Sequence, residues 1–479
     1  MYDLSHARAL LVSATLASVT GACSSAPVVS SSQPSPALAA AHWQQYASPA
    51  VAGYDAARLD LACRYADSVR SGAVMVSVNG VALAAWGDVE RKLELHSVRK
   101  SLVSALFGIA AARQQVNLDA TLGELGITDR TPLTTLERGA HIRDLLAARS
   151  GVYLPSAYAG REQDDERPKR DSHAPGTFFF YNNWDFNALG VIYEQVAKQN
   201  LYEAFRDRVA QPIGMEDYTT TDGFVVFEPS GSVHPAHTFR LSTRDLARFG
   251  ELYRKRGEWN GAQVVPADWV DASTKQITSL GNGDGYGMLW WTYAKGSLGA
   301  KYPALTQYGM FAARGTGGQF ILVVPELQMV FVHRGDTDHG REIRGPDVWR
   351  IAELVAEART GAPSQSPALA SLHAEPFASQ LPPRPKPTYL VLDSAQIAPM
   401  LGEYVSGQRL VATVSMFKGR PFILLVGQGE AELLALSPTE FRVMPVPGVE
   451  IRIARDAASG KMQLSATLNG RAMEGVRRE

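Results

Sequence analysis

The chain has 479 residues, 45% of them hydrophobic, and a net charge of −1. This charge balance excludes a basic field that would draw the protein to nucleic acid or to an anionic membrane surface. The length exceeds the usual size of one domain, and the hydrophobic content is enough for one large core and a smaller one.

The N-terminus has the pattern of a targeting segment. Residues 9–22 form an apolar run that is too short to cross a bilayer comfortably and is followed by Cys23. The sequence Thr20-Gly21-Ala22-Cys23 is similar to the lipobox of bacterial lipoproteins, although Thr20 stands where leucine is usual. We predict a lipoprotein-type signal peptide, lipid attachment at Cys23, and export to the periplasm, free or anchored to the membrane. Ordinary cleavage near Ala40 is the alternative.

After a Ser-, Pro- and Ala-rich tether, the pattern predicts a helix over residues 55–70 and a hairpin over residues 73–86. Asn79-Gly80 marks the hairpin turn, because this dipeptide is the strongest short signal for one. Helical patterns then dominate through Leu252. The later predicted elements are strands over residues 287–293 and 319–333 and a helix over residues 346–358. This order predicts an α/β domain whose antiparallel sheet is completed by distant segments, with a cleft beside the helical insert.

Ser97-Val98-Arg99-Lys100 opens an apolar stretch of helical periodicity that runs to about Gln114. Three residues of helix return a side chain to nearly the same face, so the Ser97 hydroxyl and the Lys100 amine are expected one above the other. A lysine amine takes the proton of a serine when burial or a second cation lowers its pKa. The same spacing also arises by chance in a solvated helix turn.

Tyr181-Asn182-Asn183 lies downstream, at the start of a predicted helix over residues 184–198. A tyrosine at such a junction can place its phenol in a cleft, where a nearby ammonium would lower the phenol pKa enough for proton transfer. The Asn183 amide is then placed to bind a substrate carbonyl. The alternative is a structural tyrosine and a turn asparagine.

Together these motifs resemble the serine hydrolases related to class C β-lactamases, penicillin-binding DD-peptidases, family VIII esterases and 6-aminohexanoate-dimer hydrolase. The pattern of that group is S-x-x-K, then Y-x-N, then a K-T-G or H-x-G triplet on a strand. The resemblance extends over about residues 51–358 and includes the stretches 142–146, 149–152, 242–250 and 286–291. It implies a β-lactamase/transpeptidase-like fold, an antiparallel sheet flanked by helices with a helical insert. It also implies catalysis by Ser97, Lys100 and Tyr181, with Asn183 in substrate binding.

The third motif departs from the family pattern. The expected strand, residues 310–320, has no lysine or histidine at the head of a triplet. A strand N–H near Arg314 or Gly315 would complete an oxyanion hole with the N–H of Ser97. Arg314 is either a carboxylate-binding fork in the substrate site or an outward-facing strand arginine. Without the cation of the triplet, β-lactamase or peptidase activity is less expected than esterase activity.

Other polar clusters are weaker candidates for functional sites. His234 and His237 form the one close histidine pair, but Pro235 interrupts a helical face and no acidic or cysteine partner has ligand spacing, so no metal is expected. One histidine is expected to line the cleft and the other to pack locally. Residues 161–173 carry both signs of charge, as a solvated loop or a gating loop. The chain has no P-loop and no dinucleotide fingerprint, so no cofactor is expected.

The sequence pattern of the C-terminal part is typical of a separate small domain. A Pro-rich linker is followed by short alternating strands over residues 410–414, 421–426, 431–436, 441–443, 451–455 and 462–468, which favour a small β-barrel or sandwich. The full division expected is a signal peptide (residues 1–22), a tether (23–45), a hydrolase domain (46–360), a linker (361–388) and an all-β accessory domain (389–479).

The predicted function is a serine hydrolase that acts through an acyl-enzyme on a small carboxylic ester or amide. The alternatives are β-lactamase or D-Ala-D-Ala peptidase activity, and a non-catalytic penicillin-binding-like sensor. A small-molecule substrate is the only partner expected, apart from a membrane contact through acylated Cys23. Loop shape around the cleft sets the substrate, and the sequence leaves it open.

Overall fold

The computed structural model describes residues 42–160, 165–384, 388–427, 429–444, 449–468 and 471–478. The predicted signal peptide and Cys23 lie outside these ranges. Within them, no helix combines the length and the apolar composition that a membrane crossing needs.

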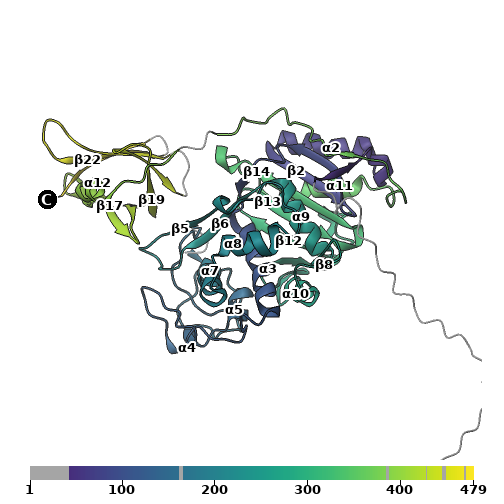
Figure 1. Ribbon diagram of the computed structural model, residues 1–479, viewed down its shortest axis with the longest axis horizontal. Coiled ribbons are helices and arrows are strands. Elements are labelled where there is room, and N and C mark those ends of the chain that lie inside the picture. Colours follow the sequence, from purple (N-terminus) through teal and green to yellow (C-terminus); the bar gives the residue numbers. More distant parts are fainter. Residues whose placement is uncertain are drawn as a thin grey trace, which may run out of the picture. The chain divides into compact units, whose positions relative to one another are not determined.

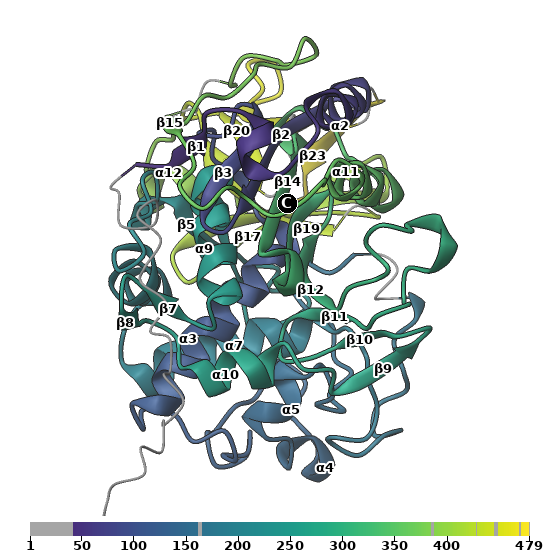
Figure 2. The ribbon, with the colours of Figure 1, turned by 90° about the vertical axis from the view of Figure 1, so that its right-hand side faces the viewer.

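A ten-stranded sheet is the frame of the larger domain (Figures 1 and 2). Its order is β15-β1-β3-β2-β14-β13-β12-β11-β10-β9, antiparallel throughout except for the β1–β3 pair. Strands from both ends of the domain therefore lie side by side, as the order of the predicted elements implied. The strands are β1 (Gln44–Tyr46), β2 (Ser71–Val78), β3 (Val81–Gly87), β9 (Thr278–Gly281), β10 (Asp284–Tyr286), β11 (Trp291–Tyr293), β12 (Met310–Gly315), β13 (Gln319–Val324), β14 (Met329–Gly335) and β15 (Leu369–Ser371).

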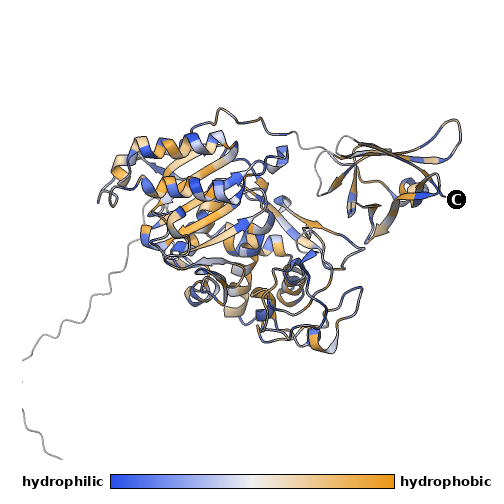
Figure 3. Ribbon diagram, turned by 180° about the vertical axis from the view of Figure 1, so that it is seen from behind, coloured by the Kyte–Doolittle hydropathy of each residue, from blue (hydrophilic) through white to orange (hydrophobic). Residues whose placement is uncertain are grey.

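Helices cover both faces of this sheet. On one face lie α2 (Ala56–Ser68) and α11 (Gly345–Glu357), and on the other lies α9 (Thr243–Arg254) (Figures 1 and 2). Hydrophobic residues are concentrated in the strands between these layers (Figure 3). Asp55 begins α2 by accepting a hydrogen bond from the Arg58 N–H, which satisfies one of the free donors of the first turn. The predicted helix and hairpin in this region are confirmed, with Asn79 and Gly80 both at positive φ in the turn.

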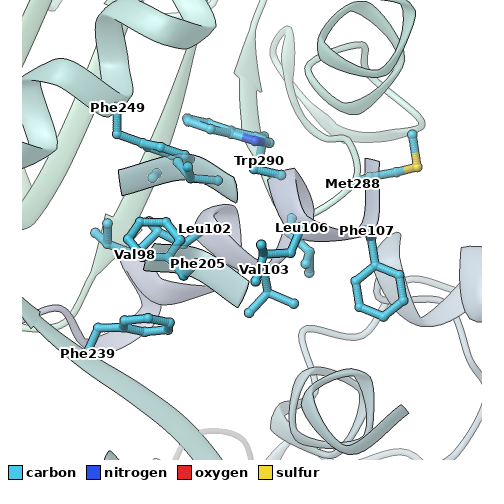
Figure 4. Close-up of a cluster of buried hydrophobic side chains, with 14 of the residues drawn as sticks. Val98, Leu102, Val103, Leu106, Phe107, Phe205, Phe239, Phe249, Met288 and Trp290 are labelled. Carbon is cyan, nitrogen blue, oxygen red and sulfur yellow. The ribbon is translucent and has the colours of Figure 1, made fainter. Parts of the chain in front are cut away.

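The helical insert is built around α3 (Arg99–Ala112), whose residues 99–110 are all buried. Its apolar side chains pack against aromatic residues of other elements (Figure 4). Around it lie α4 (Thr135–Arg138), α5 (Ile142–Leu146), α7 (Asn183–Ala197), α8 (Leu201–Phe205), α10 (Ala267–Ser273), and a small sheet of β4 (Leu93–Glu94), β6 (Ala236–Leu241) and β5 (Gly223–Val226). A helix that is buried all round provides a rigid support for the residues at its N-terminus.

The C-terminal domain is a closed eight-stranded antiparallel barrel with its own hydrophobic core. The strands are β16 (Gly402–Ser406), β17 (Arg409–Phe417), β18 (Arg420–Leu425), β19 (Gly429–Ala435), β20 (Glu440–Met444), β21 (Glu450–Arg455), β22 (Met462–Leu468) and β23 (Arg471–Arg477), and α12 (Ser394–Ile397) precedes them. The six predicted strands are all present. The first and last strands, which close the barrel, were not predicted.

Parts of the predicted tether and linker form strands of the large sheet. The predicted linker contributes β15, which pairs with β1, itself part of the predicted tether. Phe377 is also buried, and a β-carbon on Gly87 would lie 2.7 Å from its ring. These short edge strands are held by pairing between distant segments of the chain. A Pro-rich composition gives no local signal for such pairing. The predicted strand over residues 287–293 is shorter as well, because the Gly287 N–H bonds the Trp290 carbonyl in a turn before β11.

Candidate active site

Ser97, Lys100 and Tyr181 meet at the N-terminus of α3. Ser97 lies in the 3₁₀ turn His96–Val98 that leads into the helix. Lys100 Nζ lies 2.8 Å from Ser97 Oγ and 2.8 Å from Tyr181 Oη, so the amine bridges the hydroxyl and the phenol. Lys100 is buried with 2% of its surface exposed. The arrangement has the geometry of a nucleophile in contact with its base.

Burial and nearby charges shift the pKa values of Lys100 and Tyr181 in opposite directions. Burial, and then the charge of Arg99, lower the pKa of Lys100 well below 10.5, which favours the free amine. Burial raises the pKa of Tyr181 to about 12, although Ser97, Arg99 and Arg314 act in the opposite direction. The pKa of the phenol is therefore shifted upward and not downward as expected from the sequence, because burial outweighs the lowering influences of Ser97, Arg99 and Arg314. The raised pKa favours the neutral phenol, which can donate a proton.

Aromatic rings fix the Tyr181 phenol. Its ring centroid lies 4.9 Å from that of Phe186, 5.4 Å from that of Trp291 and 5.9 Å from that of Tyr286. Lys100 Nζ also lies 4.5 Å from the centroid of the Phe186 ring. Such packing leaves the phenol little rotational freedom, so its distance to the amine is held by the core.

Asn183 begins α7, two residues after Tyr181, and is 5% exposed. Its Nδ2 donates to the Tyr158 carbonyl, and its Oδ1 is buried without a hydrogen-bond partner. One of its N–H donors is therefore used internally, while a buried acceptor remains free for a ligand. The sequence predicted Asn183 in this position but not its fastening by Tyr158.

A hydrogen-bonded chain supports the turn that carries Ser97, and sequence reasoning missed it. His96 has a φ of 47° and Tyr158 a φ of 63°, both in the left-handed region that disfavours such side chains. The Tyr158 phenol donates to Glu94 Oε1 at 2.5 Å and lies 2.8 Å from His96 Nδ1, and His96 Nε2 lies 3.3 Å from Thr337 Oγ1. Since the phenol has one proton, His96 Nδ1 must donate to it. These hydrogen bonds hold His96, the residue at positive φ directly before Ser97.

Gly315 is the residue of the third motif that lies close to Ser97. A β-carbon at this position would lie 2.6 Å from the Leu95 carbonyl oxygen and 3.0 Å from the Ser97 amide nitrogen. Only glycine permits this approach of β12 to the Ser97 turn. Of the two positions considered in the sequence, the strand backbone at Gly315 is therefore the one in contact with Ser97.

Arg334 fastens the two segments that meet at this point. It is fully buried, and its guanidinium donates to Gln319 Oε1 and to the carbonyls of Leu241, Leu93 and Glu94. Gln319 is the cross-strand partner of Gly315, and Glu94 lies three residues before Ser97. Burial lowers the pKa of Arg334 to about 9. An arginine within the apolar strand β14 was the only sequence signal for this role.

Arg314 lies beside Trp291, one of the rings that pack on Tyr181. Its Nη1 donates to Tyr293 Oη at 3.1 Å, and its guanidinium carbon lies 5.1 Å from the Trp291 ring centroid. The side chain is half-buried. It is therefore neither a free surface arginine nor an ion-pair partner of a carboxylate among the described residues.

The histidine pair is structural. His234 and His237 are 4% and 3% exposed, His234 packs edge-on against Trp184, and His237 lies against Gly190. The expectation that one of them lines the cleft finds no support in these contacts. In the part of the chain that the structure describes, no three His, Cys, Asp or Glu side chains gather as metal ligands.

One family model matches the larger domain. The family model described as Beta-lactamase matches residues 49–356, which include Ser97, Lys100, Tyr181 and Gly315. No curated protein matches the chain.

Three solved structures are similar to the chain at low identity. An octameric penicillin-binding protein homologue from Pyrococcus abyssi is 14% identical, with 88% of this chain and 100% of that one covered and a TM-score of 0.45. A beta-lactamase from Mycobacterium bovis is 22% identical, with 61% and 96% covered and a TM-score of 0.44. EstCE1, a hydrolase with promiscuous acyltransferase activity, is 17% identical, with 64% and 98% covered and a TM-score of 0.45.

Proposed function

The chain belongs to the beta-lactamase family, and from this premise we propose that it hydrolyses a small carboxylic ester or amide through an acyl-enzyme on Ser97. The observation that carries the proposal is the position of Lys100 Nζ, 2.8 Å from both Ser97 Oγ and Tyr181 Oη. A binding protein without turnover has no need for a buried free amine between a hydroxyl and a phenol.

In the acylation step, the Lys100 amine takes the Ser97 proton as Oγ bonds to the substrate carbonyl carbon. The carbonyl electron pair moves onto oxygen, and the N–H groups of Ser97 and Gly315 stabilise that charge. When the intermediate collapses, the bond to the leaving group breaks and Tyr181 gives its proton to the departing oxygen or nitrogen. The Lys100 ammonium then returns a proton to Tyr181. Water repeats the sequence on the acyl-enzyme and releases the acid.

A second candidate, hydrolysis of a β-lactam or a D-alanyl-D-alanine peptide, is favoured by the place of Arg314. Its guanidinium lies beside Trp291, which packs on Tyr181, and binds no carboxylate among the described residues. A substrate carboxylate would fit this fork. Esters need no such anchor, and for this reason the ester or small amide is the first proposal.

The test is covalent labelling with a tagged fluorophosphonate, followed by peptide mapping. We expect the added mass on the peptide that contains Ser97 and no label on Ser97→Ala. Ser101→Ala is the matched control, because Ser101 lies on the same helix but donates to the Leu289 carbonyl away from the amine. Label that survives Ser97→Ala would contradict the proposal. Label on Ser97 without steady-state ester or amide turnover would indicate the non-catalytic sensor.

A further inference from the structure

Arg99 is a buried guanidinium that forms no ion pair with a carboxylate among the described residues. It is 1% exposed, its Nη2 donates to Asn187 Oδ1 at 3.2 Å, and its Nε is buried without a hydrogen-bond partner. No ion pair joins it to any of the described residues. Taking a charge out of water without an opposite charge costs several kcal/mol. A neutral side chain of similar length would avoid this cost. Stability therefore does not explain why a charged residue lies at this position.

Other buried arginines of this domain are compensated. Arg248, 2% exposed, has Glu216 Oε1 3.1 Å from its Nη2. Arg334 is hydrogen-bonded to the Gln319 side chain and to three backbone carbonyls. Arg99 has one amide oxygen at 3.2 Å, and its guanidinium carbon lies 5.9 Å from the Tyr158 ring centroid. The incomplete compensation is therefore particular to Arg99 among these three.

The position of Arg99 explains what the charge does. It is adjacent to Lys100 in the first turn of α3, and both side chains are buried at the N-terminal end of that helix. Lys100 itself has hydrogen bonds only to Ser97 and Tyr181 among the described residues. The ionisable groups around this pair on other elements are Tyr181 before α7, Asp185 on α7, Tyr202 on α8, Tyr286 on β10, Arg314 on β12, Tyr158, and Glu94 on β4.

The one carboxylate among these groups whose charge offsets Arg99 is Glu94, and its effect is smaller than that of burial. Glu94 accepts the Tyr158 phenol proton at 2.5 Å. Burial raises the pKa of Asp185 well above its usual range, and Tyr181 and Tyr286 are shifted upward in pKa by burial as well, so all three favour their neutral forms. The nearest uncompensated charge to the Lys100 amine along α3 is thus positive.

We propose that Arg99 is a positioning residue that acts on Lys100 through its charge: the fixed guanidinium disfavours an ammonium beside it and keeps the Lys100 amine free to accept the Ser97 proton. This inference rests on the proposed function. Burial is the larger influence on the pKa of Lys100 and the charge of Arg99 the second, both downward. Arg99 also lowers the pKa of Tyr181, which eases proton donation to a leaving group.

The test is the pH profile of kcat/KM with p-nitrophenyl butyrate, because a merely structural role would not move it. In Arg99→Met the charge is removed and the length kept, so the acidic limb of the profile should move upward by about one pH unit, with a rate near that of the wild type at high pH. Arg99→Lys keeps a cation and should leave the limb within a few tenths of a unit. Arg248→Met, a buried arginine away from the site, should cost stability without moving the limb.

A second variant tests the charge with Arg99 in place. Asn187→Asp puts a carboxylate where the amide oxygen lies 3.2 Å from Arg99 Nη2, so it should neutralise the guanidinium and also move the limb upward. If Arg99→Met does not fold, Asn187→Asp alone tests whether the charge of Arg99 acts on Lys100. A uniform loss of rate at every pH in both variants, with the limb unmoved, would overturn the inference. If Ser97→Ala kept full turnover, the proposed function itself would fail, whatever the Arg99 variants do.

Discussion

Gly315 of β12 lies directly against Ser97, with room for a hydrogen but not for a β-carbon between them. A β-carbon on Gly315 would lie 3.0 Å from the Ser97 amide nitrogen and 2.6 Å from the Leu95 carbonyl oxygen. The strand and the nucleophile turn therefore approach as closely as backbones can, and Arg334 holds both segments from behind. Two N–H groups fixed in this way suit the charge that develops on a carbonyl oxygen.

Gly315→Ala should lower kcat by about 10²- to 10³-fold, the usual cost of losing an oxyanion-hole donor, because the methyl group forces the strand away from Ser97. Stopped-flow acylation with a chromogenic ester measures the effect. Gly309→Ala is the matched control just before β12, since nothing lies within 4 Å of its β-carbon position. Equal rates for the two variants would remove Gly315 from the oxyanion hole.

Lys100→Met should remove activity and change how stability depends on pH. The pKa of Lys100 is lowered in the folded chain, so between that value and 10.5 the unfolded chain binds one more proton and wild-type stability rises with pH. The variant lacks this term. The unfolding free energy of the variant minus that of the wild type should therefore fall by up to about 1.4 kcal/mol per pH unit as the pH approaches 10.5.

Urea unfolding at pH 7, 8 and 9 measures that difference. Lys275→Met, at an exposed lysine, is the control and should give a constant difference. Parallel curves for Lys100→Met would mean that the buried amine is protonated in the folded enzyme, which contradicts its role as base.

Tyr181→Phe should keep the aromatic packing and lose most of kcat, because the leaving group then has no acid. The expected loss is about 10²- to 10⁴-fold, the range of a general acid–base contribution. Tyr193→Phe, on the helix α7 that follows Tyr181, is the control, since its buried hydroxyl has no hydrogen-bond partner. A Tyr181→Phe enzyme of near-normal kcat would return Tyr181 to a structural role.

The sequence predicted the elements whose signals are local. Asn79-Gly80 predicted the hairpin turn, and the spacing of Ser97 and Lys100 predicted their contact, because three residues of helix set that geometry. The pairing of β1 with β15 depends on segments some 325 residues apart in the chain, and no local pattern carries it.

The support of the site was the part that the sequence did not predict. Tyr158 holds Asn183 through its carbonyl and His96 through its phenol, contacts that depend on a loop path rather than on a motif. Arg99 and Arg334 are charged residues inside apolar stretches, which was a visible signal, but their partners come from other elements. The direction of the Tyr181 pKa shift was also beyond the sequence, because burial decides it and burial is a property of the fold.

Substrate class gives the last prediction. Short-chain p-nitrophenyl esters should be hydrolysed with a higher kcat/KM than any cephalosporin, with small amides between them. An ester needs only the nucleophile, the proton shuttle and the oxyanion hole, whereas a β-lactam also brings a carboxylate that requires a fixed cation. Arg314 lies beside the Trp291 ring that packs on Tyr181, and its guanidinium is already hydrogen-bonded to Tyr293. Steady-state rates with p-nitrophenyl butyrate and nitrocefin decide the order. Faster turnover of nitrocefin, abolished by Arg314→Ala while ester hydrolysis persists, would make Arg314 a carboxylate anchor and reverse the ranking.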